Sequence, residues 1–332
     1  MFQGQLHISH LNSGGLMTNY FCSSACRHCL YRCSPKWPKD YITPEAAGKN
    51  FETLLRLGCR SVHIGGGEPL LRPDALANVL DVANEMDVYV EYVETNSSWF
   101  KTHEEACTIL ERLVDKGLRT LLVSISPFHN EFIPFYKIKG VIHACQQAGM
   151  SVFPWISDFF SDLGAFDDQQ THSLEEYQKH FGAHYVANLP RRYWISFGGR
   201  ALNTFGQYAP EYSADEIVAA NSRGCSELTE VSHFHIDLYG NYVPGLCAGL
   251  SIRREDLGTR LSSEAYPIMS RLYARGIGEL LTYARGEYGF VPTNKSGYAL
   301  KCDLCYDIRR FLVVEYGLDS PELQPRGHYL HG

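Results

Sequence analysis

Short apolar runs alternate with amphipathic stretches along the first two thirds of the chain. The runs are rich in Val, Ile, Tyr and Phe and end at Gly, Asn or Ser, which is typical of buried strands. They predict strands at about residues 15–21, 61–64, 88–94, 120–126, 151–157 and 192–197. Because helical patterns separate these runs, the sequence predicts a parallel sheet with helices packed outside it.

Helix starts are marked by capping residues. Thr or Ser with a Pro or Glu in the following turn supplies the side-chain acceptor or the backbone angle that a first turn requires. Such signals predict helices that begin near Thr43-Pro44, Pro73-Asp74, Thr102, Ser173-Leu174 and Ser213, with further helices at 137–148 and about 263–284.

Polar residues gather where the predicted strands end. A Cys-rich loop, Gly66-Gly67-Glu68, Thr95-Asn96, 124–130, Ser157-Asp158 and Gly199-Arg200 all follow strands. In a parallel barrel the carboxyl ends of the strands surround one pocket. We therefore expect a partial (β/α)6 barrel of the TIM type, with right-handed crossovers, and keep a flat doubly wound sheet as the alternative.

Composition narrows the classes of partner. The chain has 332 residues, of which 45% are apolar and 20% charged, and this composition indicates an ordinary folded protein. Its net charge is −7 and its Lys and Arg residues are scattered, so it has no basic stripe that would bind nucleic acid. The N-terminus lacks a signal peptide, and no apolar run is long enough to span a membrane. We expect a cytoplasmic protein that binds neither nucleic acid nor membrane.

Cys22, Cys26 and Cys29 stand in a C-x3-C-x2-C arrangement on one predicted loop. Three thiolates at this spacing can hold three corners of a four-iron cluster and leave the fourth iron open. Zinc is the alternative, but a structural zinc site usually has four ligands, and this motif is a poor half of one even with His28 beside it. Cys33, Cys59, Cys107 and Cys145 are expected to pack as small apolar residues, with a role considered only for Cys33.

Gly65, Gly66, Gly67, Glu68 and Pro69 follow the second predicted strand. Glycine allows close backbone approach and positive φ, and a carboxylate beside an ammonium group makes a charge-assisted hydrogen bond. A Gly-rich turn before a helix can also bind phosphate, but the acidic Glu68 argues against that reading.

These motifs resemble those of radical S-adenosylmethionine (radical SAM) enzymes. The resemblance implies that Cys22, Cys26 and Cys29 bind a 4Fe-4S cluster whose open iron is chelated by SAM, with His28 at the motif's variable position. Residues expected to contact the cofactor are Gly66, Gly67, Glu68, Pro69, Thr95, Asn96 and Ser124. The family's Asp on strand four is replaced by Ser126, which departs from the pattern, and plain strand-end polarity is the alternative reading for both serines.

A second group of cysteines lies downstream. Residues 231–238 alternate and precede a Tyr-Gly-Asn turn, so a hairpin is expected between Cys225 and Cys247, and a helix leads on to Cys302 and Cys305. Four thiolates can hold structural zinc, and the arrangement also resembles the SPASM and twitch domains, which implies a second, auxiliary 4Fe-4S cluster. We expect a barrel at 1–222 and a small α+β auxiliary-cluster domain at 223–332.

The resemblance implies reductive cleavage of SAM and abstraction of a hydrogen atom from a substrate, with an electron donor such as flavodoxin or ferredoxin. A peptide or protein is the first expected substrate, although few residues precede Cys22 to hold a leader-binding domain. Oxidation of a small aminocyclitol or sugar is the second, and a non-catalytic iron-sulfur or zinc protein is the remote alternative. No acid or base is identified among the candidates Tyr31, His129, Glu131, Asp158 and Arg200.

Overall fold

The computed structural model describes residues 4–293 and 297–331. Its strands are β1 (Gly14–Met17), β2 (Ser61–Gly65), β3 (Tyr89–Thr95), β4 (Thr120–Val123), β5 (Ser151–Pro154), β6 (Phe234–Asp237), β7 (Asn241–Val243) and β8 (Ile252–Arg253). The helices are α1 (Pro44–Arg56), α2 (Pro73–Glu85), α3 (His103–Asp115), α4 (Pro127–Asn130), α5 (Phe135–Gln147), α6 (Phe159–Leu163), α7 (Leu174–Phe181), α8 (Tyr185–Arg192), α9 (Arg200–Phe205), α10 (Ala214–Ala220), α11 (Pro267–Arg275), α12 (Ile277–Tyr288), α13 (Lys301–Arg310) and α14 (Gly327–Leu330).

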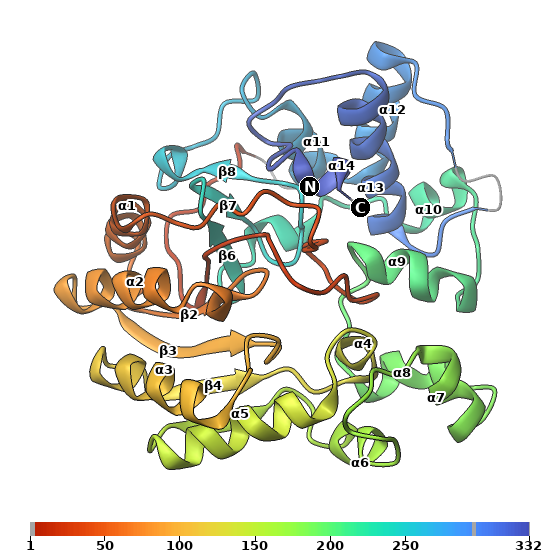
Figure 1. Cartoon of the computed structure of the whole chain (residues 1–332). Coiled ribbons are helices and arrows are strands. Elements are labelled where there is room, and N and C mark those ends of the chain that lie inside the picture. The colour runs from red at the N-terminus through yellow and green to blue at the C-terminus, as the bar shows by residue number, and fades with distance from the viewer. Residues whose placement is uncertain (1–3, 294–296, 332) are drawn as a thin grey trace.

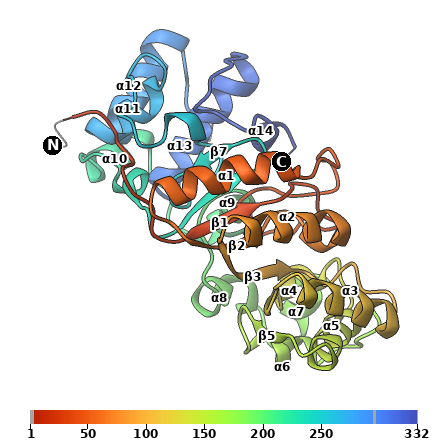
Figure 2. The same ribbon diagram turned by 90° about the vertical axis from the view of Figure 1, so that its left-hand side faces the viewer.

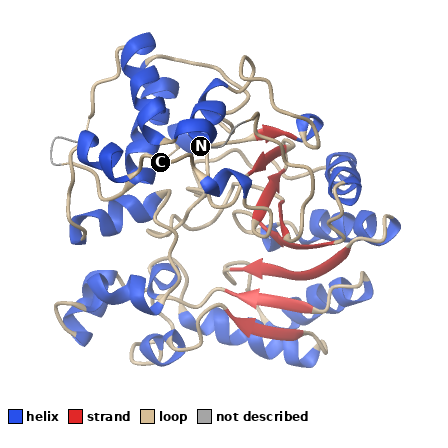
Figure 3. Ribbon diagram, turned by 180° about the vertical axis from the view of Figure 1, so that it is seen from behind, coloured by secondary structure: helices blue, strands red, loops and turns tan. Residues whose placement is uncertain are grey.

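The strands form one open, curved sheet in the order β5-β4-β3-β2-β1-β6-β7-β8 (Figures 1 and 3). Pairing is parallel from β5 through to β6, and β7 and β8 add antiparallel strands at the far edge. The expected open α/β sheet of the partial-barrel type is confirmed, and the first five parallel strands fall where the sequence places them.

The sixth predicted strand, at 192–197, is wrong. Helix α8 runs to Arg192, and residues 193–197 after it pair with no strand in the described structure. It lies beside the end of β5 through ring contacts, with Trp194 stacked on Trp155 at 6.3 Å. The sixth parallel strand is β6, which lies on the other side of β1.

The predicted hairpin is confirmed as β6 and β7, which pair antiparallel across a turn at Gly240. Since β6 also pairs with β1, the hairpin extends the same sheet that carries the first cysteine loop. The sheet therefore runs continuously across the expected boundary at residue 222, and that division into domains stays a prediction.

Helices cover the outer face of the parallel strands, with α1 and α2 side by side over β1 and β2 (Figure 2). The Thr43, Thr102, Ser173 and Ser213 caps are confirmed, because each side chain accepts a hydrogen bond from a backbone N–H in the first turn of its helix. Their sequence signals are local and do not depend on the rest of the fold.

The stretch predicted as helical at about 263–284 is helical but interrupted. It is two helices, α11 and α12, which meet at Gly276. This glycine has φ +77°, and a Cβ there would lie 2.1 Å from the Arg223 carbonyl oxygen. The break lets the chain turn against the segment that follows α10.

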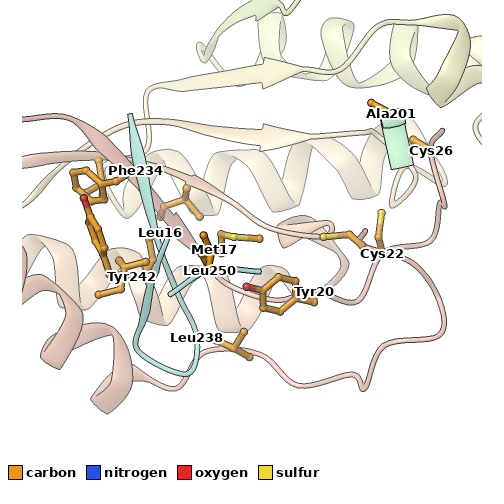
Figure 4. Close-up of a cluster of buried hydrophobic side chains, with 14 of the residues drawn as sticks. Leu16, Met17, Tyr20, Cys22, Cys26, Ala201, Phe234, Leu238, Tyr242 and Leu250 are labelled. Atoms are coloured by element: carbon orange, nitrogen blue, oxygen red, sulfur yellow. The ribbon is translucent and has the colours of Figure 1, made fainter. Parts of the chain in front are cut away.

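Side chains alternate across β1 and its neighbours. Leu16 and the rings of Phe234 and Tyr242 lie in the buried core, and Figure 4 shows Cys22 and Cys26 toward one end of this apolar cluster, with Ala201 of α9 beside Cys26. The opposite face of the sheet carries His63 and His235. Within the described residues, no helix is both long and apolar enough to cross a bilayer.

Candidate active site

A cavity of about 220 Å³ lies at the carboxyl ends of the parallel strands. It brings together residues that the sequence predicts from five separate segments. The predicted residues that line it are Cys22, Cys26, His28, Cys29, Tyr31, Cys33, Gly66, Gly67, Glu68, Pro69, Thr95, Asn96, Ser124, His129 and Arg200.

The cysteine loop follows β1 and is held in place by Arg200 of α9. The guanidinium donates to the Cys26 carbonyl at 2.9 Å and to the Cys33 carbonyl at 2.6 Å. Burial raises the pKa of the Cys22 thiol to about 12 and that of Cys26 well above its usual value. A hydrogen bond from the Cys33 thiol lowers the pKa of Cys29 to about 6.

Gly66 and Gly67 lie against the backbone of the cysteine loop. The Gly67 amide donates to the Asn19 carbonyl at 2.7 Å, and the Glu68 amide donates to the Phe21 carbonyl at 3.2 Å. A Cβ at Gly67 would lie 2.0 Å from the Phe21 oxygen, and Gly66 has φ +146°. The glycines thus allow close contact between two loops, and their expected contact with a ligand stays a prediction.

Glu68 is fully buried and joins this turn to the end of β3. One carboxylate oxygen accepts from the Leu70 amide at 3.1 Å and the Thr95 hydroxyl at 2.9 Å, and the other accepts from the Asn96 amide at 2.6 Å. The Asn96 side chain in turn donates to the Cys22 sulfur at 3.3 Å. Burial raises the pKa of Glu68 to about 7, so a cationic group beside it would stabilise its charged form.

His28 of the cysteine loop packs against α4. Its ring lies 4.6 Å from the ring of Phe128, its Nδ1 atom has no hydrogen-bond partner, and burial lowers its pKa well below the usual value. Ser124 lies at the cavity, with its amide bonded to the Thr95 carbonyl. Ser126 instead caps α4 and contacts His129 Nδ1 at 2.7 Å.

Two of the candidate residues, Asp158 and Glu131, do not line the cavity. Asp158 is exposed, and Glu131 pairs with Arg27 at 2.9 Å. These side chains take part in surface and packing interactions.

The second cysteine group lines another cavity of about 710 Å³. Cys225, Cys247, Cys302 and Cys305 all lie on it, although their sequence positions are widely separated. Leu30 lies on both cavities, so the two cysteine groups are neighbours across the first loop. In the described chain no group of three or more His, Cys, Asp or Glu side chains is arranged to hold a single metal ion, and metal analysis must distinguish iron-sulfur from zinc.

Sequence reasoning missed part of the cavity wall. Tyr92 and Glu94 reach it from β3, His235 reaches it from β6, and His233 reaches it from the residue before β6. Burial raises the pKa of Glu94 to about 7. The alternation of His233, His235 and Asp237 with apolar residues was the available signal, but only the placement of β6 beside β1 brings that face to the cavity.

The donor set fits a buried iron-sulfur cluster. The Cys22 and Cys26 thiols are 6% exposed each and lie in surroundings where an isolated thiolate is unfavourable, whereas a metal-bound thiolate is stabilised by the cation. The Asn96 amide supplies a hydrogen bond to the Cys22 sulfur, a contact of the kind that tunes such clusters.

Comparison with known families gives a match over residues 16–154 to the radical SAM superfamily. Two curated relatives are similar: GTP 3',8-cyclase of Acidothermus cellulolyticus, 28% identical over 142 residues, and a probable GTP 3',8-cyclase of Methanocaldococcus jannaschii, 26% identical over 165 residues. The matches cover 39% and 43% of this chain, and the chain spans 38% and 53% of those relatives. The segment that carries the cysteine loop and β1–β5 is thus a radical SAM superfamily domain, the domain of radical SAM enzymes.

Among solved structures, "Native anSMEcpe with bound AdoMet" is 10% identical, with a TM-score of 0.47 and coverage of 92% of this chain and 97% of that one. "Crystal structure of BtrN in complex with AdoMet and 2-DOIA" is 13% identical, with a TM-score of 0.42 and coverage of 83% and 91%. These likenesses are distant.

Proposed function

We propose, from the radical SAM superfamily domain at residues 16–154, that this protein is an enzyme that cleaves SAM reductively and abstracts a hydrogen atom from its substrate. The observation that carries the proposal is the convergence of Cys22, Cys26, Cys29, Glu68 and Asn96 on one cavity. When bound, the cluster and SAM would supply the one-electron cleavage of the sulfonium and a 5'-deoxyadenosyl radical.

The chain's own residues would hold these groups. The three cysteines would bind three irons, and Glu68 and Pro69, with the turn at Gly66 and Gly67, would border the methionine end of SAM. Thr95, Asn96, Ser124 and His28 line the remaining wall, where a nucleoside would contact polar side chains. Asn96 supports this assignment because it contacts both Glu68 and Cys22.

A peptide or protein side chain is the proposed substrate, modified by crosslinking, thioether formation, epimerisation or oxidation. Trp194, 59% exposed and stacked on Trp155 at the cavity, offers an apolar surface that suits a peptide side chain. The names of the curated relatives concern GTP, and because the chain spans only part of their length we do not extend that substrate to it.

Oxidation of a small aminocyclitol or sugar is the second candidate. The polar side chains of Glu94, His233 and His235 on the cavity wall favour it, since they could bind the hydroxyl and amino groups of such a substrate.

We propose a second 4Fe-4S cluster on Cys225, Cys247, Cys302 and Cys305, with a role in electron transfer. Support comes from the shared cavity of these cysteines and from the position of Leu30 between the two sites. Flavodoxin or ferredoxin would reduce the first cluster. Structural zinc is the alternative occupant of the second site.

Anaerobic incubation of the cluster-loaded protein with SAM and a reductant tests the proposal. The expected products are 5'-deoxyadenosine and methionine, quantified by chromatography. Cys29→Ser should abolish them, whereas Cys107→Ser is the matched control, because Cys107 lies on α3 and lines neither cysteine-containing cavity. Absence of 5'-deoxyadenosine from wild-type protein with a full complement of iron would refute the proposal.

A further inference from the structure

Glu94 is a carboxylate on the cavity wall that has no partner among the described residues. It lies near the end of β3, and its side chain makes neither a hydrogen bond nor an ion pair with any residue that the structure describes. Glu68, the other carboxylate on this wall, accepts hydrogen bonds on both of its oxygens. Polar groups inside a protein are normally paired, so an unpaired carboxylate in a cavity indicates a ligand that pairs with it.

The backbone of β2 leaves room for this carboxylate. Gly65 is the last residue of β2, which pairs with β3, and a Cβ at this position would lie 2.9 Å from Glu94 Oε2. A side chain at residue 65 would therefore displace the carboxylate. Because residue 65 is glycine, Glu94 lies close to the backbone of β2 and still reaches the cavity.

No positively charged side chain of the described wall balances Glu94. Arg200 is the one Lys or Arg among the described residues that line the cavity, and its guanidinium donates to two backbone carbonyl groups of the cysteine loop. His233 and His235 also line the cavity, but burial lowers the pKa of both rings, so both are neutral near pH 7. We therefore expect the positive partner of Glu94 to come from a ligand.

Aromatic side chains line the cavity together with Glu94. Tyr92 lies two residues before it on the same face of β3, and burial, with the charge of Glu94 after it, raises the pKa of the Tyr92 hydroxyl. The ring of Trp155 lies 6.2 Å from that of Tyr193 and 6.3 Å from that of Trp194, and all three line the cavity. Aromatic faces attract cations and a carboxylate binds an ammonium group by charge-assisted hydrogen bonds, so this wall suits an organic ammonium.

We propose that the substrate carries a primary ammonium group and that Glu94 binds this group. The ammonium N–H groups donate to the Glu94 oxygens, and the aromatic rings pack against the carbon atoms beside them. Burial raises the pKa of Glu94 to about 7, and the positive charge of the ligand would stabilise the ionised carboxylate. Glu94 is thus a residue that determines specificity for the substrate.

Glu94 would act on the substrate of the proposed radical SAM enzyme, so this assignment rests on the proposed function. An aminocyclitol or amino sugar carries an ammonium group, and the side chain of a lysine in a peptide carries one too. The ammonium is the chemistry that the two candidate substrates share, and separate probes distinguish the two sources.

Binding is measured by isothermal titration calorimetry on the full-length, cluster-loaded protein with SAM, kept anaerobic and without reductant. The amine probes are cyclohexylamine for the cyclic source and N-acetyl-lysine methylamide for the peptide source. Their neutral counterparts are cyclohexanol and N-acetyl-norleucine methylamide. At least one amine should bind about tenfold or more tightly than its neutral counterpart, because the counterpart lacks the charge-assisted hydrogen bond, and the amine that does so identifies the source.

Glu94→Gln keeps the size of the side chain and removes its charge, and it should abolish the preference for the amine. Glu91→Gln is the matched control, because Glu91 lies on the same strand but outside the cavity, where it accepts from the Ser61 hydroxyl. In this variant the preference should persist. A urea unfolding curve for each variant identifies any that is misfolded, and Glu94→Asp, which keeps the charge, should keep part of the preference.

Failure of both amines to bind, or a preference for the amine that Glu94→Gln leaves unchanged, would overturn the inference. Loss of SAM affinity in Glu94→Gln, measured by equilibrium dialysis, would assign the carboxylate to the cofactor and overturn it too. Because binding of the amines does not require SAM cleavage, absence of 5'-deoxyadenosine in the reductive assay would refute the proposed function alone.

Discussion

Replacement of Glu68 by Gln tests the link between the Gly-Gly-Glu-Pro turn and the end of β3. The carboxylate accepts hydrogen bonds from the Leu70 amide, the Thr95 hydroxyl and the Asn96 amide, at 3.1, 2.9 and 2.6 Å. In Gln one oxygen becomes an NH2 group. Whichever way the amide turns, that group faces a backbone N–H donor in a site with no exposure to solvent.

The expected loss of stability follows from this mismatch. A buried donor left without an acceptor costs about 1–3 kcal/mol, and we expect Glu68→Gln to lower the free energy of unfolding by about 1–2 kcal/mol, since the neutral amide is less costly to bury than the carboxylate. If Glu68 also contacts the ammonium group of SAM, losing a hydrogen bond between charged groups, of about 1.5–3 kcal/mol, should weaken SAM binding by about 10- to 150-fold.

Glu322→Gln provides the matched control. Glu322 is also a buried carboxylate that accepts two backbone hydrogen bonds, from the Ile268 and Met269 amides at 2.9 and 2.8 Å, but it lies at the start of α11. Urea unfolding and equilibrium dialysis with SAM, both on cluster-loaded protein, measure the two effects. Both variants should lose stability, and only Glu68→Gln should lose SAM affinity. A Glu68→Gln protein with wild-type affinity would show that Glu68 only caps the turn.

Three further outcomes are expected. Gly199→Ala should lower the free energy of unfolding in urea by about 1–3 kcal/mol more than Gly149→Ala. Both glycines have positive φ, but only at Gly199 would a Cβ meet backbone, 2.2 Å from the Leu30 oxygen. Equal losses in the two variants would contradict this. Cys305→Ser should remove about half of the bound iron while 5'-deoxyadenosine formation continues, and loss of zinc instead would favour the alternative occupant. Burial raises the pKa of Glu94 to about 7 from an ordinary 4.5, so ionisation of Glu94 as the pH rises through this range destabilises the folded wild-type protein. The free energy of unfolding of Glu94→Gln, measured relative to wild type, should therefore increase by about 2 kcal/mol from pH 5 to pH 8. A difference between the two proteins that does not change with pH would refute the shift.

The parts of the fold that the sequence predicts are those with local signals. The Thr43 and Ser213 caps and the five strands β1–β5 depend on patterns within a few residues. The segment after Arg192 has an apolar composition typical of a strand, yet no neighbouring strand offers it backbone partners. The long-range pairing of β6 with β1 depends on the tertiary fold, which no local pattern describes.

The residues of the candidate site also divide into those that local sequence motifs predict and those that only the tertiary fold brings together. Cys22, Cys26, Cys29 and Glu68 lie in contiguous motifs, and the sequence predicts that they meet at one cavity. His63 and His235 are 172 residues apart, and each alone resembles an ordinary buried histidine. Only the register of the two strands on either side of Gly15 brings them into contact.

The central claim is that SAM binds the open iron of a cluster held by three cysteines, and pulsed electron paramagnetic resonance tests it most directly. The reduced, cluster-loaded protein is mixed with SAM labelled with nitrogen-15 in the amino group and oxygen-17 in the carboxylate. We expect hyperfine coupling of both nuclei to the cluster, lost in Cys29→Ser and kept in Cys107→Ser, since Cys107 lies outside the cavity. A cluster signal that labelled SAM leaves unchanged would contradict the account.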